Sequence, residues 1–193
     1  MKNLKSILSI SLVCSVFAVS TWAEVVSKVE LGIPKSGVVV EGIGVPGVDL
    51  GDTREEVLTS YGEPTQCTSV ASIGDMASCV YRLDIGEQVS IRYRGADGRD
   101  AQNSQNDIVQ SIRWIGMDEW ITSAGVNYNL AHNHSEALLD AYPDPTLLSR
   151  SHFTGEISRL IDVAQGFTVS RSYNPYSNRT STRLSIFPAR PVQ

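Results

Sequence analysis

The sequence lacks an apolar run of the length that a membrane-spanning helix needs. Its main apolar run, Ile7–Val19, follows Lys2 and Lys5 and precedes the small-residue site Thr21–Ala23, and together these match a cleavable export signal. The run is shorter than the roughly 20 apolar residues of a spanning helix. We therefore expect residues 1–23 to be a signal peptide, and the mature protein to be periplasmic or secreted with no transmembrane segment.

Positive charge is also in deficit. The chain has 16 Lys and Arg against 21 Asp and Glu, a formal net charge of −5, and loss of the signal with Lys2 and Lys5 takes this to −7. Domains that bind nucleic acid are typically basic, because they must neutralise phosphates. The composition therefore argues against a nucleic-acid partner.

Cysteine is scarce, with only three in the chain. Cys14 lies in the expected signal, which leaves Cys67 and Cys79. In an exported protein an even pair typically forms a disulfide, and a metal-binding or catalytic role is the alternative. The bridge would close a loop of about 13 residues and contribute about 3 kcal/mol in the chain-entropy model. We predict a Cys67–Cys79 disulfide.

The patterns that carry catalysis are missing as well. No serine lies in a Gly-x-Ser-x-Gly elbow, and no glycine cluster has the context of a phosphate loop. His132 and His134 with Glu136 resemble an alternating metal-ligand cluster, but they lie where a helix is expected to begin and where polar capping residues are favoured. The sequence thus identifies no catalytic residue, no metal site and no cofactor.

The most informative stretch is Gly47–Cys67. Thr53 and Glu56 have the spacing of a capping box, in which each side chain accepts a hydrogen bond from the other's backbone N–H, and Asp52 with Glu55 fits the same pattern one residue earlier. Gly62 can adopt the left-handed conformation that ends a helix, and Pro64 prevents its continuation. The residues at helical spacing on one face are Val57, Leu58 and Tyr61. A helix of roughly nine residues is expected here.

A weaker copy of this unit follows about 80 residues later, a periodicity that indicates an internal duplication. Ser135–Thr146 echoes Arg54–Thr65, and Gly166–Tyr173 echoes Gly86–Tyr93. We expect the second helix over about 135–142 and strands at the following ranges: 79–84, 88–94, 108–115, 156–164, 167–173 and 182–187. Periodicity alone leaves 156–164 open between helix and strand, and the repeat favours strand.

The expected fold class is therefore α+β. Two tandem repeats, each a short helical segment followed by an antiparallel β-meander, place their helices on one face of the sheet and leave the other face to solvent. The expected division is 1–23 signal peptide, 24–46 extended lead-in with a strand near Val38–Val40, 47–116 first repeat, 117–188 second repeat and 189–193 frayed tail.

Alternation along the strands identifies the open face. Val89, Ile91 and Tyr93 alternate with polar residues, so Arg92 and Arg94 point away from the core. In 108–115, Ile108, Ile112 and Trp114 are expected inward, and Val109, Ser111 and Arg113 outward. The same alternation places Thr168, Ser170, Arg183 and Ser185 outward. The candidate partner-binding residues are Ser90, Arg92, Arg94, Arg113, Ser170 and Arg183.

Several of these features together resemble the repeat unit of the β-lactamase inhibitory proteins. They are the capped helix start Gly51–Leu58, then Gly62, then the pair Cys67 and Cys79. That unit, a helix pair followed by a four-stranded antiparallel sheet, is present twice in tandem. It also occurs in small outer-membrane lipoproteins of the β-barrel assembly machinery. The resemblance covers about residues 47–187 and implies this fold with a sheet face that grips a protein partner.

The chain departs from both families in ways that bear on function. Its second half has no cysteine pair, and Asp84–Glu87 lacks the aromatic residues that flank the acidic loop of the inhibitors. A β-lactamase target is therefore not implied. Cys14 follows Val13 instead of a small residue, unlike a lipoprotein signal.

We expect an exported, non-catalytic protein-binding module, with inhibition as one form that the binding could take. Its partner would be a protein in the cell envelope or outside the cell, held through the open sheet face. The competing class is a periplasmic small-ligand-binding protein or an enzyme.

Overall fold

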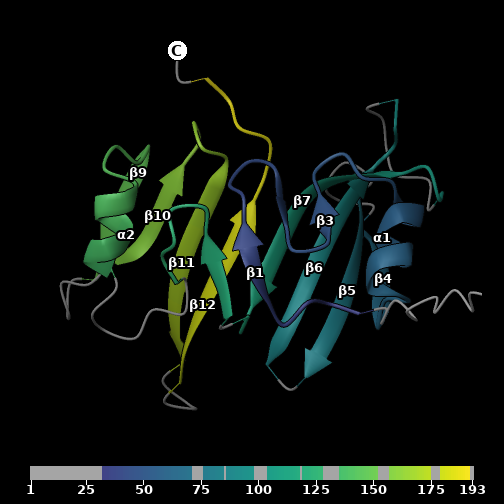
Figure 1. Ribbon diagram of the computed structural model, residues 1–193, viewed down its shortest axis with the longest axis horizontal. Helices are drawn as coiled ribbons and strands as arrows, with labels where there is room; N and C mark the ends of the chain where they lie inside the picture. Colours follow the sequence, from purple (N-terminus) through teal and green to yellow (C-terminus); the bar gives the residue numbers. More distant parts are fainter. Residues whose placement is uncertain are drawn as a thin grey trace, which may run out of the picture. The chain divides into compact units, whose positions relative to one another are not determined.

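The fold is mostly β-structure with two short helices. The computed structural model describes residues 32–70, 76–84, 86–97, 104–117, 119–127, 135–151, 157–174 and 179–191. Its main feature is an open sheet of eight antiparallel strands (Figure 1). In order across the sheet these strands are β4 (Gln66–Val70), β5 (Met76–Asp84), β6 (Glu87–Arg94), β7 (Ile108–Ile115), β12 (Arg179–Ile186), β11 (Phe167–Asn174), β10 (Ile157–Asp162) and β9 (Leu147–Arg150).

The strand order places the two halves of the chain side by side. Helix α1 (Arg54–Tyr61) precedes β4 to β7, and helix α2 (Ser135–Ala141) precedes β9 to β12. Within each set every strand pairs with its neighbour in sequence, and the last strands, β7 and β12, pair with each other through Leu184 opposite Trp114. The expected antiparallel sheet and both short helices are confirmed. In the range 156–164, where periodicity left helix open, the described residues Ile157–Asp162 form a strand.

Helix α1 is capped at Thr53, one of the two caps that its sequence allows, and ends before Gly62 as expected. The Thr53 hydroxyl accepts a hydrogen bond from the Glu56 N–H at 3.2 Å, and the Glu56 carboxylate accepts one from the Thr53 N–H at 2.7 Å. Gly62 follows the helix with a φ of 79°, in the left-handed region that glycine tolerates. Val57 and Tyr61 are buried. The capping box fixes the start of a helix that is only eight residues long and would be marginal alone.

One face of the sheet is apolar and carries the helices. A row of paired residues crosses six strands, and all its members are buried: Tyr81, Val89, Trp114, Leu184, Val169 and Leu160. At the α1 end the ring of Tyr61 lies edge-on to Tyr81, with centroids 5.6 Å apart. At the other end lies Tyr142, just after α2, with its ring centroid 4.5 Å from that of Phe167. We call this the inner face, and the opposite one the outer face.

The segment before α1 is built into the fold. Its strand β1 (Ser36–Val39) pairs in parallel with β8 (Glu119–Thr122), and β2 (Gly44–Val45) pairs with β3 (Val48–Asp49). The fully buried Trp120 of β8 packs 5.5 Å from Trp114 and donates a hydrogen bond from Nε1 to the Pro34 carbonyl at 2.9 Å. The strand expected near Val38–Val40 is therefore confirmed, and its partner is a strand of the second half.

The expected alternation of β7 is wrong at its start. Arg92 pairs with Ser111, but the next residue, Tyr93, pairs with Val109, so Gln110 is an extra residue in β7. Such a bulge shifts the side-chain phase by one. Val109 is therefore only 2% exposed on the inner face, where an outward position was expected, and Ile108 pairs with the outward Arg94. Ile112, Trp114 and the outward Arg113 keep their expected positions.

The expected cross-link is present: a disulfide joins Cys67 of β4 to Cys79 of β5, which lie opposite each other in the two strands. A disulfide fits a protein that folds in an oxidising compartment. No helix among the described residues is long and apolar enough to cross a membrane. The expected signal peptide, with Cys14, and all three histidines lie outside the described residues.

Candidate functional site

The outer face is lined by hydroxyl and guanidinium groups. Strand pairing brings a second row of residues together across the centre of the sheet: Ser90, Arg113, Ser185 and Thr168. These positions alternate with the buried inner row, so their side chains point away from the core. Residues two positions from members of this row also point outward. Arg92 pairs with Ser111 on one side of the row, and Arg183 pairs with Ser170 on the other side.

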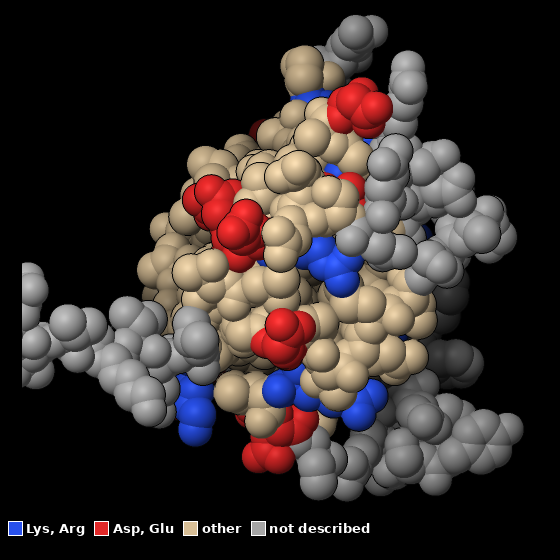
Figure 2. Space-filling view, turned by 90° about the vertical axis from the view of Figure 1, so that its right-hand side faces the viewer, with Lys and Arg blue, Asp and Glu red and all other residues tan. Residues whose placement is uncertain are grey.

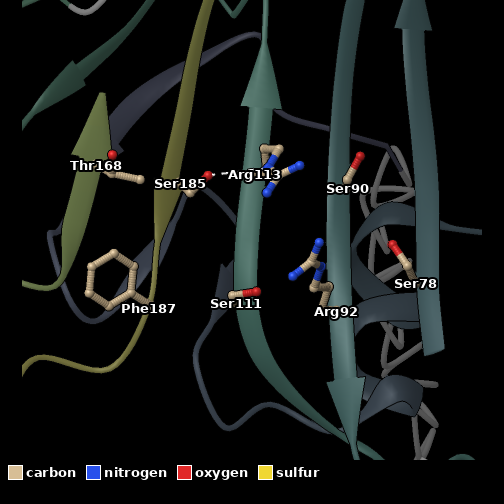
Figure 3. Close-up of a pocket in the computed structure, with 8 residues that line it drawn as sticks. All are labelled: Ser78, Ser90, Arg92, Ser111, Arg113, Thr168, Ser185 and Phe187. Carbon is tan, nitrogen blue, oxygen red and sulfur yellow. Dashed lines mark hydrogen bonds between the residues drawn. The ribbon is translucent and has the colours of Figure 1, made fainter. Parts of the chain in front are cut away.

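This face is hollowed at its centre. A depression of about 350 Å³, which we call the central hollow, crosses five strands of the sheet (Figure 3). Its lining residues are Ser78, Ser90, Arg92, Ser111, Arg113, Thr168, Ser185 and Phe187. The short serine and threonine side chains leave the space, and the longer arginines and Phe187 form its walls. The centre of the outer face is thus concave, polar and cationic.

Two arginines of this face, Arg92 and Arg113, line the hollow. Figure 3 shows the guanidinium groups of Arg92 and Arg113 both lying over the gap between β6 and β7. The Arg113 Nε donates a hydrogen bond to the Ser185 hydroxyl at 3.3 Å, which ties β7 to β12. Burial lowers the pKa of Arg113, and the charges of Arg92 and Arg183 lower it further. The positive charges of Arg92 and Arg183 therefore both lie close enough to Arg113 to repel it.

Nothing in the described part of the chain neutralises this group. No described Asp or Glu forms an ion pair with Arg92, Arg113 or Arg183, whereas Arg150 at the sheet edge contacts Glu136 at 3.4 Å. Arg92 and Arg183 are exposed and Arg113 is half-buried. A like-charged cluster of this kind is costly unless an anion reaches it.

Charges at the α1 end are arranged differently. Figure 2 shows this end of the molecule, where small acidic and basic groups are interspersed among uncharged residues. Mixed charges of this kind are typical of a solvated surface. The contrast makes the central hollow the more distinctive polar feature.

The structure brings together part of the expected site. Ser90, Arg92 and Arg113 line the central hollow. Arg94, Arg183 and Ser170 lie on the same face outside it, and the Ser170 hydroxyl donates to the Arg183 carbonyl at 3.4 Å. Alternation also placed Ser111, Thr168 and Ser185 correctly on this face. Ser78 and Phe187 were missed, although an outward Ser78 follows from the alternation of β5 once Cys79 is known to face inward.

The inner face offers polar groups of another kind. The hydroxyls of Tyr81 and Tyr93 lie 3.0 Å apart, and the guanidinium of Arg54 lies 5.7 Å from the centre of the Tyr93 ring. Burial raises the pKa of Tyr93, and the hydrogen bond with Tyr81 raises it further. The hydroxyls therefore stay protonated at neutral pH and hold the core together, which does not suit a catalytic base.

No group of three or more metal-ligating side chains is present in the described ranges, and His132 and His134 lie outside them. The central hollow is therefore the candidate functional site. Comparison of the chain with protein-family models, with curated proteins and with solved structures finds no match.

Proposed function

We propose that this chain is an exported, non-catalytic protein-binding module that docks an acidic partner surface on its outer face. The observation that carries the proposal is the cluster of Arg92, Arg113 and Arg183, which has no acidic partner among the described residues. The chain as a whole is acidic, with a net charge of −5, so its arginines are not concentrated here by composition alone.

The chemistry of the face suits recognition of a protein. Arginine carries five N–H donors in a planar fork, is weakly hydrated and is enriched at interfaces. The small hydroxyl residues between the arginines let a partner's backbone or side chains approach the sheet. An acidic surface would relieve the repulsion among the three arginines, and it would be attracted to them over a distance of about 8–10 Å at physiological salt.

The topology supports the rest of this proposal. Each helix is followed by a four-stranded antiparallel meander, and the two meanders meet at β7 and β12. We propose that the two halves are tandem repeats of the kind that the sequence resembles, the repeat unit of the β-lactamase inhibitory proteins. In that architecture the open face of the sheet holds the partner. The disulfide between Cys67 and Cys79 fits a periplasmic or secreted location.

The test is to capture the partner from an envelope fraction and then reverse the charge of the cluster. We expect Arg92→Glu, Arg113→Glu and Arg183→Glu together to weaken binding at least a hundredfold, because three attractions become repulsions. Wild-type binding should also weaken steeply as salt rises. The measurement is a titration by surface plasmon resonance at two salt concentrations.

A matched control changes the net charge equally elsewhere. Lys35, Arg150 and Arg190 are exposed and do not line the central hollow. Their combined change to Glu should leave affinity within about threefold. Equal loss in both triple variants would show that net charge decides the binding. Unchanged affinity in a folded cluster variant would rule out the outer face.

A second candidate function is small-ligand binding. Its supporting observation is the volume of the central hollow, about 350 Å³, which is at the lower end of the range for small-molecule pockets. A thermal-shift screen against metabolites tests it, since a ligand of the native state raises the melting temperature.

A further inference from the structure

The central hollow has two chemically different ends. Arg92 and Arg113 extend over the gap between β6 and β7, and the ring of Phe187 lies on the opposite side, at the end of β12 (Figure 3). Hydroxyl groups lie between them. An occupant of the hollow would therefore meet cationic donors at one end and an apolar ring at the other.

The size of the hollow decides between classes of anion. The hollow, at about 350 Å³, is many times larger than the volume of about 30 Å³ that one water molecule takes in the liquid. A bare inorganic anion such as chloride or phosphate would fill only a fraction of that space. It would also leave Phe187 in contact with water. An anion that carries an apolar group would fill the hollow and use both of its ends.

The orientation of Arg113 suits a planar anion. Its Nε is already used by the bond to the Ser185 hydroxyl, which limits how the guanidinium plane can turn. The terminal nitrogens then present two N–H groups in the fork that a carboxylate accepts in a bidentate fashion. Arg92 approaches the same gap from β6 and supplies the second cation. Between them a single negative charge would be held from two sides.

We propose that the central hollow binds an organic carboxylate, with the carboxylate between Arg92 and Arg113 and its apolar portion against Phe187. The carboxylate can come from two sources. One is an Asp or Glu side chain of the docked protein, in which case the inference rests on the function proposed above and names the residue type that anchors the partner. The other is a free small carboxylic acid.

The first experiment needs no variant. Phenylacetate is titrated into the full mature protein, and the arginine Nε–H signals are followed by nitrogen-15 NMR. The Arg113 and Arg92 signals should shift and saturate. Phenylacetamide has the same shape without the charge, and inorganic phosphate has the charge without the ring. Each should bind at least tenfold more weakly. Equal affinity for the amide or for phosphate would overturn the proposal.

The second experiment uses variants with a matched control. Arg113→Gln should weaken phenylacetate binding about tenfold or more. Phe187→Ala should weaken binding of phenylacetate and leave the weaker binding of acetate unchanged. Arg159→Gln removes an exposed arginine of β10 that does not line the hollow, and it should leave affinity within twofold. Equal losses in Arg113→Gln and Arg159→Gln, with unaltered melting temperatures, would contradict a specific site.

The third experiment distinguishes the two sources. If a partner side chain supplies the carboxylate, saturating phenylacetate should weaken partner binding in competition, and replacing the anchoring Asp or Glu by its amide should abolish that competition. If the protein binds phenylacetate and its partner independently, the carboxylate comes from a free small acid. If reversing the charge of Arg92, Arg113 and Arg183 leaves partner affinity unchanged, the docking proposal fails. The phenylacetate titration still tests the carboxylate site, because it does not involve the partner.

Discussion

The two ends of the sheet hold their helices in different ways. At the first end several contacts are local in sequence: α1 has its capping box, Tyr61 packs on Tyr81, and the disulfide links the two strands that follow. The start of α1 is also held from further along the chain, where the Asp107 carbonyl accepts a hydrogen bond from the Arg54 N–H at 2.8 Å. At the second end Tyr142, which follows α2, donates a hydrogen bond to Glu41, from the segment that precedes α1. That contact spans 101 residues.

The difference shows what the early segment does. Glu41 also accepts hydrogen bonds from the N–H and the hydroxyl of Ser123, just after β8. Together with the pairing of β1 with β8 and the bond from Trp120 to Pro34, these contacts attach the beginning of the fold to its second half. The early segment therefore contacts both ends: the Pro46 carbonyl accepts a hydrogen bond from the Tyr61 hydroxyl at 2.7 Å at the first end, and Glu41 accepts one from Tyr142 at the second.

Alkaline pH should give the largest effect and act more strongly on the first end. Burial raises the pKa of Tyr61, Tyr81 and Tyr93 there above the ordinary value of 10.0, and burial with the hydrogen bond to Glu41 raises that of Tyr142 at the second end. The unfolded chain loses these protons near pH 10 and the folded chain retains them. Stability is therefore fully present below pH 10 and falls above it, by up to about 1.4 kcal/mol per pH unit for each tyrosine.

The measurement is urea unfolding from pH 8 to 11.5. Tyr61→Phe and Tyr142→Phe should each reduce the loss of unfolding free energy per pH unit by the contribution of one tyrosine, because phenylalanine has no proton to lose. Stability that stays constant from pH 10 to 11.5 would contradict retained protons at these sites.

Removing the disulfide should lower stability next most strongly and should loosen the first end alone. The bridge closes a loop with a sequence separation of 12, so replacing Cys67 and Cys79 together by Ala should cost about 3 kcal/mol in the chain-entropy model. Chemical unfolding gives the total. Hydrogen exchange should show faster opening of β4 and β5, with β10 and β11 little changed. Equal loosening of both ends would mean that the two halves unfold as one unit.

The parts that sequence predicts well are those whose cause is local. The helix start and stop depend on neighbours within a few residues, as the capping box of Thr53 and Glu56 and the end at Gly62 show. The disulfide was predictable because Cys67 and Cys79 have no competing cysteine outside the expected signal peptide. The outward position of Arg92 and Arg113 followed from simple alternation. Pairing of β7 with β12 then brought Arg113 beside Ser185, and alternation alone contains no information about that contact.

The parts that sequence missed depend on contacts between distant segments. The bulge at Gln110 is a feature of the pairing between β6 and β7. Simple alternation along 108–115 does not predict the change of phase that buries Val109. Strand β8 exists because β1 pairs with it from far along the chain. The central hollow arises only when small side chains from five strands meet, so its volume and the role of Phe187 had no signal in any one strand.

Glu41→Gln should have an intermediate effect, on the second end. A hydrogen bond to a charged group contributes about 1.5–3 kcal/mol, and glutamine keeps the shape of the side chain and loses the charge. We expect a loss in this range and faster exchange in α2 and β8, with α1 unaffected. Tyr142→Phe removes the same bond from the other side. A double-mutant cycle should therefore give a loss for both changes smaller than their sum, and strict additivity would mean that the two groups do not interact.

Thr53→Ala should have the smallest effect, confined to the start of α1. It removes the hydroxyl that accepts from the Glu56 N–H, and loss of an N-cap acceptor typically costs about 1 kcal/mol. Thr53→Asn keeps an acceptor in the same place, so its stability should stay within about 0.5 kcal/mol of wild type.

Thr53→Ala also separates the two hydrogen bonds that act on Glu56. The pKa of Glu56 is lowered chiefly by the hydrogen bond from the Thr53 N–H and further by the Thr53 hydroxyl. In Thr53→Ala the backbone bond remains and the side-chain bond is gone, so NMR titration should find a Glu56 pKa that rises part of the way toward its ordinary value. A full return would mean that the backbone bond also breaks and that α1 begins later in the chain.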